Sequence, residues 1–498
     1  MKTRIFYCTV YKDHTLSPIS STMSTFGNIK KNHVYPANRS SSGNNWSYTN
    51  GNPQIRFTIS GVEDIYFLSR TLRLNGQLKV FQTVNNVETY PQNHDRNQSG
   101  FVQCLLNEYI GVMACIQSIQ ISNSNNLLIE DIQHYNRMLA SMVPKTAEFG
   151  DYVLSTGTQY GASGNGDCQG NLVNEQMFFS CPIVAGAFLE GLPIPCGGPN
   201  KGTGGLEMVI NLAPPSAVLF GKDASAFEYR IVNPSITFST AYPSSGTLPT
   251  IAMQPFKSIS SYYSVLNTGD QQIQLNCGLR NVISSQSNTI PTRWISDFGQ
   301  DSMGTPCLLN GLDPNSTTVK APLTRVTFLR NGVQFPLRYA LTASIGTTLG
   351  GTTQENVAQI QREYLGASKP ISELDRTIVG LSSEAQQGSF PRFLNNSTTP
   401  DPLSANVPPR VPYVTANSVP NTSGDGAGGF AKPFCNVGAG WGVRYDRLGT
   451  GSGADFSKQP YQMRIESRLD GDSPNSVYTF MLSQQAIVYG SGGIMIQA

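Results

Sequence analysis

Histidine is the side chain that most often moves protons near neutral pH, and this sequence uses it sparingly. Only four histidines occur in 498 residues, and all lie in the first third of the chain: His14, His33, His94 and His134. Nucleophilic catalysis needs a base within reach of a serine or cysteine, and no Gly-x-Ser-x-Gly elbow occurs. His134 lies in a segment with helical spacing, where we interpret it as a surface or hydrogen-bonded histidine. The sequence therefore predicts no Ser-His-Asp site and no other catalytic residue.

Glycine-rich segments can bind phosphate groups, but those of this chain lack the required spacing. Gly221-Lys222 has no glycine five residues earlier, as a P-loop requires. The glycine clusters at residues 161–166 and 197–205 do not lead from a strand into a helix, so we interpret them as turns. We therefore expect no phosphate-binding loop and no bound cofactor.

Neighbouring acidic residues are candidates for metal binding or acid catalysis. Asp470 and Asp472 resemble the start of a calcium loop, but Pro474 and the missing sixth-position glycine interrupt that pattern. The pairs Glu63-Asp64 and Glu130-Asp131 give no sign of two carboxylates that face each other across a substrate. We interpret both pairs as solvated turns and predict no metal site.

The cysteines indicate free thiols in a reducing compartment. Their number is odd, no two form a Cys-x-x-Cys pair, and the short apolar run after Arg4 is no convincing secretory signal. The longest apolar run, residues 178–189, is also too short to cross a bilayer. The nine cysteines are Cys8, Cys104, Cys115, Cys168, Cys181, Cys196, Cys277, Cys307 and Cys435.

Basic residues concentrate at the start of the chain. The whole protein has 34 basic and 32 acidic residues, a net charge of +2 that is too small to drive nucleic-acid binding. Residues 1–50 are basic and rich in Asn, Ser and Gly, and we predict a flexible N-terminal arm there. Lys30-Lys31 could contact nucleic-acid phosphates or a membrane surface, and the alternative is a solvated tail. Met23 resembles a natural start, so we expect residues 1–22 to be an upstream extension.

The composition favours an all-β protein. Charged residues make up 13% of the chain, and 48 glycines and 31 prolines interrupt it, which is typical of loop-rich β structure. Two large β domains fit 498 residues better than three average ones. Residues 227–282 contain the join, because a Pro/Gly/Ser-rich connection separates two β-forming runs there. We predict a first domain over residues 51–245 and a second over residues 256–498.

Alternating apolar residues predict the strands of the first half. Asn75-Gly76 lies between two short alternating runs, which is the strongest short-range signal for a hairpin. Residues 132–142 have helical spacing and are followed by Pro144, so we predict a helix there. The predicted strands cover residues 55–59, 72–80, 115–121 and 206–212.

The second half repeats this order. Residues 273–277 correspond to residues 55–59, and Asn331-Gly332 follows the first Asn-Gly pair by 256 positions (331 − 75). Met463 restarts the alternation 257 positions after Leu206 (463 − 206). Strands joined by long connections favour two consecutive jelly-roll β-sandwiches. A short helix is predicted over residues 357–364, and the loop insertion over residues 367–435 is predicted to form an exposed tower.

Three segments of the second half carry a resemblance to a known family. They are Phe328-Leu-Arg-Asn-Gly-Val-Gln-Phe-Pro336, Gly440-Trp-Gly-Val-Arg-Tyr-Asp446 with Gly453-Ala-Asp-Phe-Ser after it, and the closing Tyr478-Thr-Phe-Met-Leu run. With its segments in this order along residues 50–498, the chain resembles one family. This family is the double jelly-roll major capsid proteins of the lineage that includes adenoviruses and nucleocytoplasmic large DNA viruses. The chain is most similar to those of polinton-like viruses and virophages.

The resemblance implies two eight-stranded jelly rolls, with short helices in the inter-strand loops, and three chains that form a pseudo-hexameric capsomer. Capsomers would tile the icosahedral shell of a double-stranded DNA virus, with loops as outward towers. The basic arm would lie inside, near genome DNA or an internal membrane. The implied partners are further copies of the chain, penton proteins and minor or cement capsid proteins, with no small-molecule substrate. The implied location is the virion, after assembly in the host cytoplasm, nucleus or viral factory.

The sequence also leaves a different class of function open. A secreted double jelly-roll protein could bind carbohydrate or cleave glycans, and would need a carboxylate-lined groove or an aromatic platform. The three tryptophans Trp46, Trp294 and Trp441 are scattered, so we interpret them as core or interface residues. Large β surfaces with few charges can bury wide subunit contacts without leaving charges unpaired, which favours the structural, self-assembling protein.

Overall fold

The computed structural model describes strand-rich parts of both halves of the chain. The described residues are 26–38, 43–62, 65–89, 111–139, 177–189, 193–197, 203–219, 224–243, 253–267, 269–291, 323–335, 340–342, 440–446, 453–467, 475–490 and 493–497. Several predictions lie outside these residues: those for residues 1–22, 357–364 and 367–435, and those for Glu63-Asp64, Gly221-Lys222, Trp294, Asp470 and Asp472.

The first half of the chain forms two antiparallel sheets. The larger sheet contains β1 (Phe26–Val34), β11 (Glu228–Pro243), β4 (Tyr66–Val84) and β5 (Val87–Thr89) in that order, with β2 (Asn45–Trp46) on β11 and with β8 (Met177–Pro182) and β9 (Ile194–Pro195) on β4. The smaller sheet has the order β3 (Gln54–Ser60), β10 (Gly205–Leu212), β6 (Ile116–Asn123) and β7 (Leu128–Ile132). Short helices join the strands: η1 (Gly111–Cys115), α3 (Gly186–Leu189), α4 (Pro215–Val218) and η3 (Ala224–Ala226).

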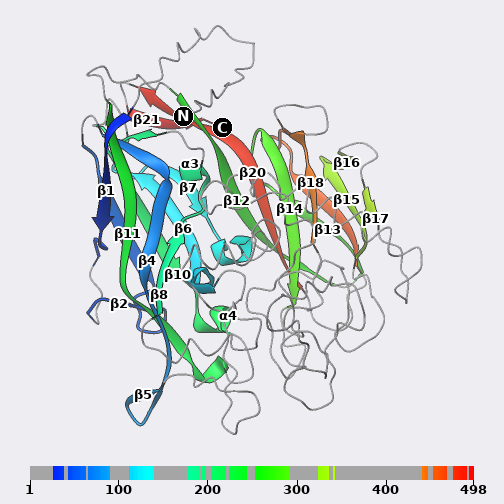
Figure 1. Ribbon diagram of the computed structural model, residues 1–498. Coiled ribbons are helices and arrows are strands. Elements are labelled where there is room, and N and C mark those ends of the chain that lie inside the picture. The colour runs from blue at the N-terminus through cyan, green and yellow to red at the C-terminus, as the bar shows by residue number, and fades with distance from the viewer. Residues whose placement is uncertain are drawn as a thin grey trace, which may run out of the picture.

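The second half repeats the arrangement. One sheet has the order β12 (Met253–Leu266), β20 (Asn475–Gly490), β14 (Val282–Pro291) and β18 (Gly440–Arg444), with β21 (Gly493–Gln497) on β20. The other has the order β13 (Gly269–Leu275), β19 (Tyr461–Ser467), β15 (Leu323–Arg330) and β16 (Val333–Gln334), with β17 (Ala340–Thr342) on β15. Figure 1 shows the two halves side by side.

The same topology occurs twice, and it is that of a jelly roll. Strands β12, β20, β14 and β18 take the places of β1, β11, β4 and β8, while β13, β19, β15 and β16 take those of β3, β10, β6 and β7. Each half therefore has two sheets, each with four strands in the jelly-roll order, and the connections between these strands cross from one sheet to the other. The predicted fold class, two consecutive eight-stranded jelly rolls, is confirmed.

Alternation explains how each strand contributes to a core. In β3 the side chains of Ile55, Phe57 and Ile59 are buried and those of Arg56 and Thr58 are exposed, because successive residues point to opposite faces. Residues 206–212, also predicted as a strand, form β10 beside β3. The strand predicted over residues 115–121 is β6, which lies on the other side of β10.

Strand β20 is buried on both faces. Val477 and Met481 belong to the core of the second half, whereas Phe480, Leu482 and Ile487 belong to the core of the first half. Adjacent residues of one strand therefore pack into different cores. The sheet that contains β20 closes the first jelly roll as well as its own.

The predicted hairpin at Asn75-Gly76 is wrong, because β4 runs straight through both residues. Partners on both sides hold the strand extended: Asn75 lies opposite Ser235 of β11 and Ser180 of β8. A Cβ on Gly76 would lie 3.0 Å from the Phe179 ring, so this glycine makes room for a side chain rather than for a turn. Strand pairing has overridden the local preference.

Turns fall at two other Asn-containing pairs. Asn85-Asn86 joins β4 to β5 with φ values of 53° and 63°. Asn331-Gly332 joins β15 to β16 with φ values of 50° and 77°, as predicted. Positive φ at both central residues is the geometry of a type I′ turn. The pairing of the two Asn-Gly segments as equivalents is wrong, however, because β15 takes the place of β6 and not of β4.

The N-terminal segment differs from the flexible arm predicted over residues 1–50. Residues 26–34 form β1, which pairs with β11 along the edge of the first sheet. Lys30 and Lys31 are exposed on this strand, opposite Thr240 and Ser239. Trp46 is 3% exposed in β2 and packs in the core, as predicted. An edge strand was missed because its polar residues show no alternation.

We expect the two halves to unfold in one transition, because β20 contributes to both cores. Met481→Ala and Leu482→Ala should each lower the free energy of unfolding by about 2–5 kcal/mol and shift the same transition. Denaturant unfolding followed by fluorescence and circular dichroism measures this. Two separate transitions, each moved by only one of the substitutions, would contradict the shared sheet.

Candidate interaction surfaces

The two halves meet where β12 lies against β7 and α3 (Figure 1). We call this contact the junction, and its apolar side chains on the second half include Phe256, Ile259, Ile283, Phe480 and Leu482. All five are buried with the core of the first half. Burial of this apolar surface favours the contact by roughly 25 cal/mol for each Å² removed from water.

A buried carboxylate joins three elements at the junction. Glu130 of β7 is 2% exposed. Its Oε2 accepts a hydrogen bond from the backbone N–H of Ala187 in α3 at 3.0 Å, and its Oε1 accepts one from Ile259 of β12 at 2.9 Å. Burial raises the pKa of Glu130 to about 7, against the lowering effect of backbone N–H groups of Ala187, Ile259 and Gly186. The interpretation of Glu130-Asp131 as a solvated turn is therefore wrong.

Gly186 brings two backbones into close contact beside this carboxylate. A Cβ at residue 186 would lie 1.8 Å from the carbonyl oxygen of Lys257 in β12, and 3.0 Å from Oε1 of Glu130. No side chain fits there without movement of the backbone. The first helical residue of α3 is thus a glycine because β12 passes directly over it.

Aromatic side chains border the junction. The His134 ring lies 4.9 Å from that of Tyr478 and 6.1 Å from that of Tyr263, and its Nδ1 is 3.4 Å from Gln117 Nε2. Burial, and then the charge of Arg137, lower the pKa of His134. The interpretation of His134 as a hydrogen-bonded histidine is confirmed. The helix predicted over residues 132–142 is only partly right, because Ile132 ends β7 and helical structure begins at Tyr135.

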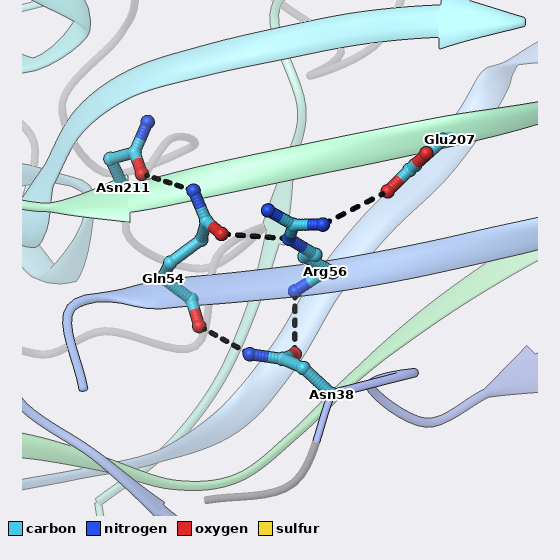
Figure 2. Close-up of polar contacts among 5 residues, drawn as sticks. All are labelled: Asn38, Gln54, Arg56, Glu207 and Asn211. Atoms are coloured by element: carbon cyan, nitrogen blue, oxygen red, sulfur yellow. Dashed lines mark hydrogen bonds and ion pairs between the residues drawn. The ribbon is translucent and has the colours of Figure 1, made fainter. Parts of the chain in front are cut away.

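The outward side of β3 and β10 carries a row of polar contacts, which we call the first outer face (Figure 2). Gln54 donates to Asn211 Oδ1 at 3.2 Å, and Arg56 donates to Gln54 Oε1 at 2.7 Å. Arg56 Nη1 also lies 4.0 Å from Glu207 Oε1. The side-chain amide of Asn38 satisfies the backbone of β3 at the edge of the sheet. Its Nδ2 donates to Gln54 O at 2.7 Å, and its Oδ1 accepts from the Arg56 N–H at 2.9 Å.

The equivalent strands β13 and β19 carry the same kinds of residue, which we call the second outer face. Gln462 donates to Gln274 Oε1 at 3.1 Å, and Arg464 Nη2 lies 2.6 Å from Asp270 Oδ2. Hydrogen bonds from Arg464 lower the pKa of Asp270. Each outer face therefore has an amide pair next to an exposed ion pair. The arginine lies on β3 in the first face but on β19, the equivalent of β10, in the second.

The outer face of the β1–β11–β4–β8 sheet is also polar. Arg73 donates from Nε to Ser180 Oγ at 2.9 Å, and Asn75 donates to Thr237 Oγ1 at 3.1 Å. In the second half the equivalent sheet, with β12 and β20, presents the apolar side chains of the junction instead. Two topologically equivalent faces thus have opposite character.

The residues that the structure describes include no cluster of three or more His, Cys, Asp or Glu side chains that could hold a metal ion. None of the helices within the described ranges is long and apolar enough to span a bilayer. Cys115, Cys181, Cys196 and Cys277 are free thiols, and burial raises the pKa of each.

Solved structures share this fold, although no family model and no curated protein matches the sequence. The Faustovirus major capsid protein superposes with a TM-score of 0.51 and 10% identity, over 98% of this chain and 93% of that chain. A PBCV-1 protein that was fitted into a reconstruction of the virophage Sputnik gives a TM-score of 0.50 and 10% identity, over 99% of both chains. The chain therefore has the double jelly-roll fold of viral major capsid proteins, and the fold that the resemblance implied is confirmed.

Gly186→Ala should disrupt the junction. The added methyl group cannot fit 1.8 Å from Lys257 O, so we expect a loss of about 3 kcal/mol in the free energy of unfolding. Gly332→Ala is the matched control, because no atom lies within 4 Å there and only its φ of +77° opposes the change. This control should cost about 1 kcal/mol. Equal losses in thermal or denaturant unfolding would contradict the close approach of β12 and α3.

Stability should fall as the pH rises from about 4.5 to about 7. The pKa of Glu130 is higher in the folded protein than its ordinary 4.5, so the folded state binds more protons in this interval. A difference of this size amounts to about 3 kcal/mol. Denaturant unfolding at pH 5 and pH 8 measures it. Glu130→Gln does not titrate and should show a smaller fall; the same fall in both proteins would contradict the assignment.

Proposed function

We propose that this chain is a major capsid protein that self-assembles as trimers with six-fold pseudosymmetry. The observation that carries the proposal is the junction, where one jelly roll packs its β12–β20 sheet on the β7 and α3 edge of another. Both halves have the same topology, so an equivalent contact between chains can repeat the arrangement. The fold shared with viral major capsid proteins supports this function.

The proposed surface for the next contact is the outer face of the β1–β11–β4–β8 sheet. It is equivalent to the face that makes the junction, and in the proposed trimer it packs on the β16 and β18 edge of a neighbouring chain. Such a head-to-tail contact is heterologous. It forms a closed ring when the rotation between neighbouring chains brings the last chain back to the first. Three chains with two jelly rolls each give a ring of six.

The difference in polarity between the two faces fits this order of assembly. Phe480 and Leu482 make the junction apolar, as is typical of a permanent contact. Arg73, Asn75 and Thr237 make the equivalent face polar, so a single chain can remain soluble before it meets its partners. Ile29 and Tyr35 at the β1 edge, 64% and 66% exposed, add apolar contact area.

In this proposal the protein is a structural component of the virion rather than an enzyme. Its main partners are further copies of itself, which tile an icosahedral shell around double-stranded DNA. Penton and minor or cement capsid proteins would complete the shell. We also propose that the chain divides into two domains between Pro243 and Met253, with β1 in the first domain.

The mass of the purified protein in solution tests this function. We expect a stable trimer, and negative-stain images of the same fraction should show particles with a hexagonal outline. Lys79→Glu, which reverses a half-buried charge on the β4 face, should weaken the trimer by about tenfold or more, whereas Lys458→Glu on an exposed loop should not. A protein that stays monomeric and binds glycans would contradict the proposal and favour the carbohydrate-binding alternative.

A further inference from the structure

Asn-Gly pairs are positions where a protein backbone can react with its own side chain. Because glycine has no side chain, its backbone nitrogen can approach the carboxamide carbon of the asparagine before it. The sequence contains five such pairs, and three of them lie in the described residues: Asn50-Gly51, Asn75-Gly76 and Asn331-Gly332. The structure holds these three pairs in different ways, which decides where the reaction can occur.

Asn331-Gly332 forms an exposed turn between β15 and β16. The two residues have φ values of 50° and 77°, and a Cβ built on Gly332 would meet no atom within 4 Å. No neighbouring atom on that side therefore prevents the Gly332 nitrogen from closing a five-membered ring with the Asn331 side chain. Water also reaches this exposed turn, so it can accept and supply the protons that the reaction moves.

A glutamine of the neighbouring strand β19 restrains the reacting nitrogen. The Gly332 N–H donates to Gln462 Oε1 at 2.8 Å, and Gln462 is only 7% exposed. Gln462 Nε2 in turn donates to Gln274 Oε1 at 3.1 Å, which fixes the acceptor in place. The nitrogen must lose its proton before it attacks, so its hydrogen bond to Gln462 has to break first. Gln462 therefore slows the reaction without preventing it.

Asn75-Gly76 is an unreactive reference in the same chain. Asn75 Nδ2 donates to Thr237 Oγ1 at 3.1 Å, which holds the carboxamide on the neighbouring strand β11. A Cβ on Gly76 would lie 3.0 Å from the Phe179 ring, so the backbone here is tightly enclosed. The ring cannot form at this pair while β4 remains in its sheet.

Asn50-Gly51 is a second exposed turn and serves as a reactive reference. The Gly51 N–H donates to Tyr48 O of the same turn at 3.3 Å, which is long for a hydrogen bond. This nitrogen is thus held by its own turn and not by Gln462. A change at Gln462 should leave its reactivity unaltered.

We propose that Asn331 is a site of spontaneous deamidation whose rate is set by Gln462. The Gly332 nitrogen gives its proton to water and bonds to Cγ of Asn331, the Cγ–Nδ2 bond breaks, and Nδ2 takes up a proton and leaves as ammonia. Water then opens the ring at either carbonyl carbon and returns a proton to the nitrogen, which leaves aspartate or isoaspartate. Water is the only other reactant, and nothing is oxidised or reduced.

The products alter an edge of the second jelly roll. Aspartate places a new negative charge on the turn, and isoaspartate adds one carbon atom to the main chain between β15 and β16. The pairs Leu329 with Gln334 and Arg330 with Val333 lie directly beside this turn, so a longer main chain disturbs them. Deamidation of Asn331 is independent of the proposed trimer, although the trimer uses the same edge.

Peptide mapping by mass spectrometry of the folded, full-length protein tests the proposal. The protein is incubated in mildly alkaline buffer, and aspartate and isoaspartate are quantified over time at Asn50, Asn75 and Asn331. We expect conversion at Asn50 and Asn331 and none at Asn75. Gln462→Leu removes the acceptor and should speed conversion at Asn331 roughly twofold to tenfold, the effect of losing one hydrogen bond, with no change at Asn50.

Gln462→Glu is the matched control, because its carboxylate still accepts from the Gly332 N–H and conversion at Asn331 should be no faster than in the wild type. Asn75 reports opening of the sheet, so its conversion together with Asn331 in Gln462→Leu would assign the faster rate to unfolding and overturn the role of Gln462. An unmodified Asn331 after Asn50 has been converted would overturn the site itself. Equal rates at Asn331 in the wild type and Gln462→Leu would overturn its control by Gln462.

Discussion

The structure depends on one contact, the junction that buries both faces of the sheet containing β12 and β20. One face completes the core of the second jelly roll, and the other covers the open edge of the first. Glu130 accepts hydrogen bonds from buried backbone N–H groups of both halves, and Gly186 lets the two backbones approach. Because the first core includes side chains from both halves, the first jelly roll is not complete without the second.

Three levels of contact follow from this arrangement, and they differ in chemistry. Apolar side chains join the two halves of one chain. In the proposed trimer, a polar sheet face joins chains into a ring, and exposed ion pairs lie on the outside of that ring. Each level is weaker and more easily reversed than the one before it. A closed shell needs this gradation, because errors between large units are corrected only if their contacts can break.

Alternation of apolar and polar residues was enough to predict two similar all-β halves and strands such as β3 and β10, because side chains that alternate with a period of two show which face of a strand is buried. The two eight-stranded jelly rolls were implied by the family resemblance. Local signals failed where distant strands decide the outcome. Asn331-Gly332 forms its predicted turn, while Asn75-Gly76 is held straight by β8 and β11 on either side. The burial of Glu130 could not be predicted either, since its partner Ile259 is 129 residues away in the chain.

A cryo-electron microscopy reconstruction of the purified assembly tests the central claim most directly, because it shows what covers each sheet. We predict that the outer face of the β1–β11–β4–β8 sheet packs on the β16 and β18 edge of the neighbouring chain, in the way that the β12–β20 sheet packs on β7 and α3. A reconstruction in which that face is open to solvent, or meets the same face of another chain, would contradict the repeated junction.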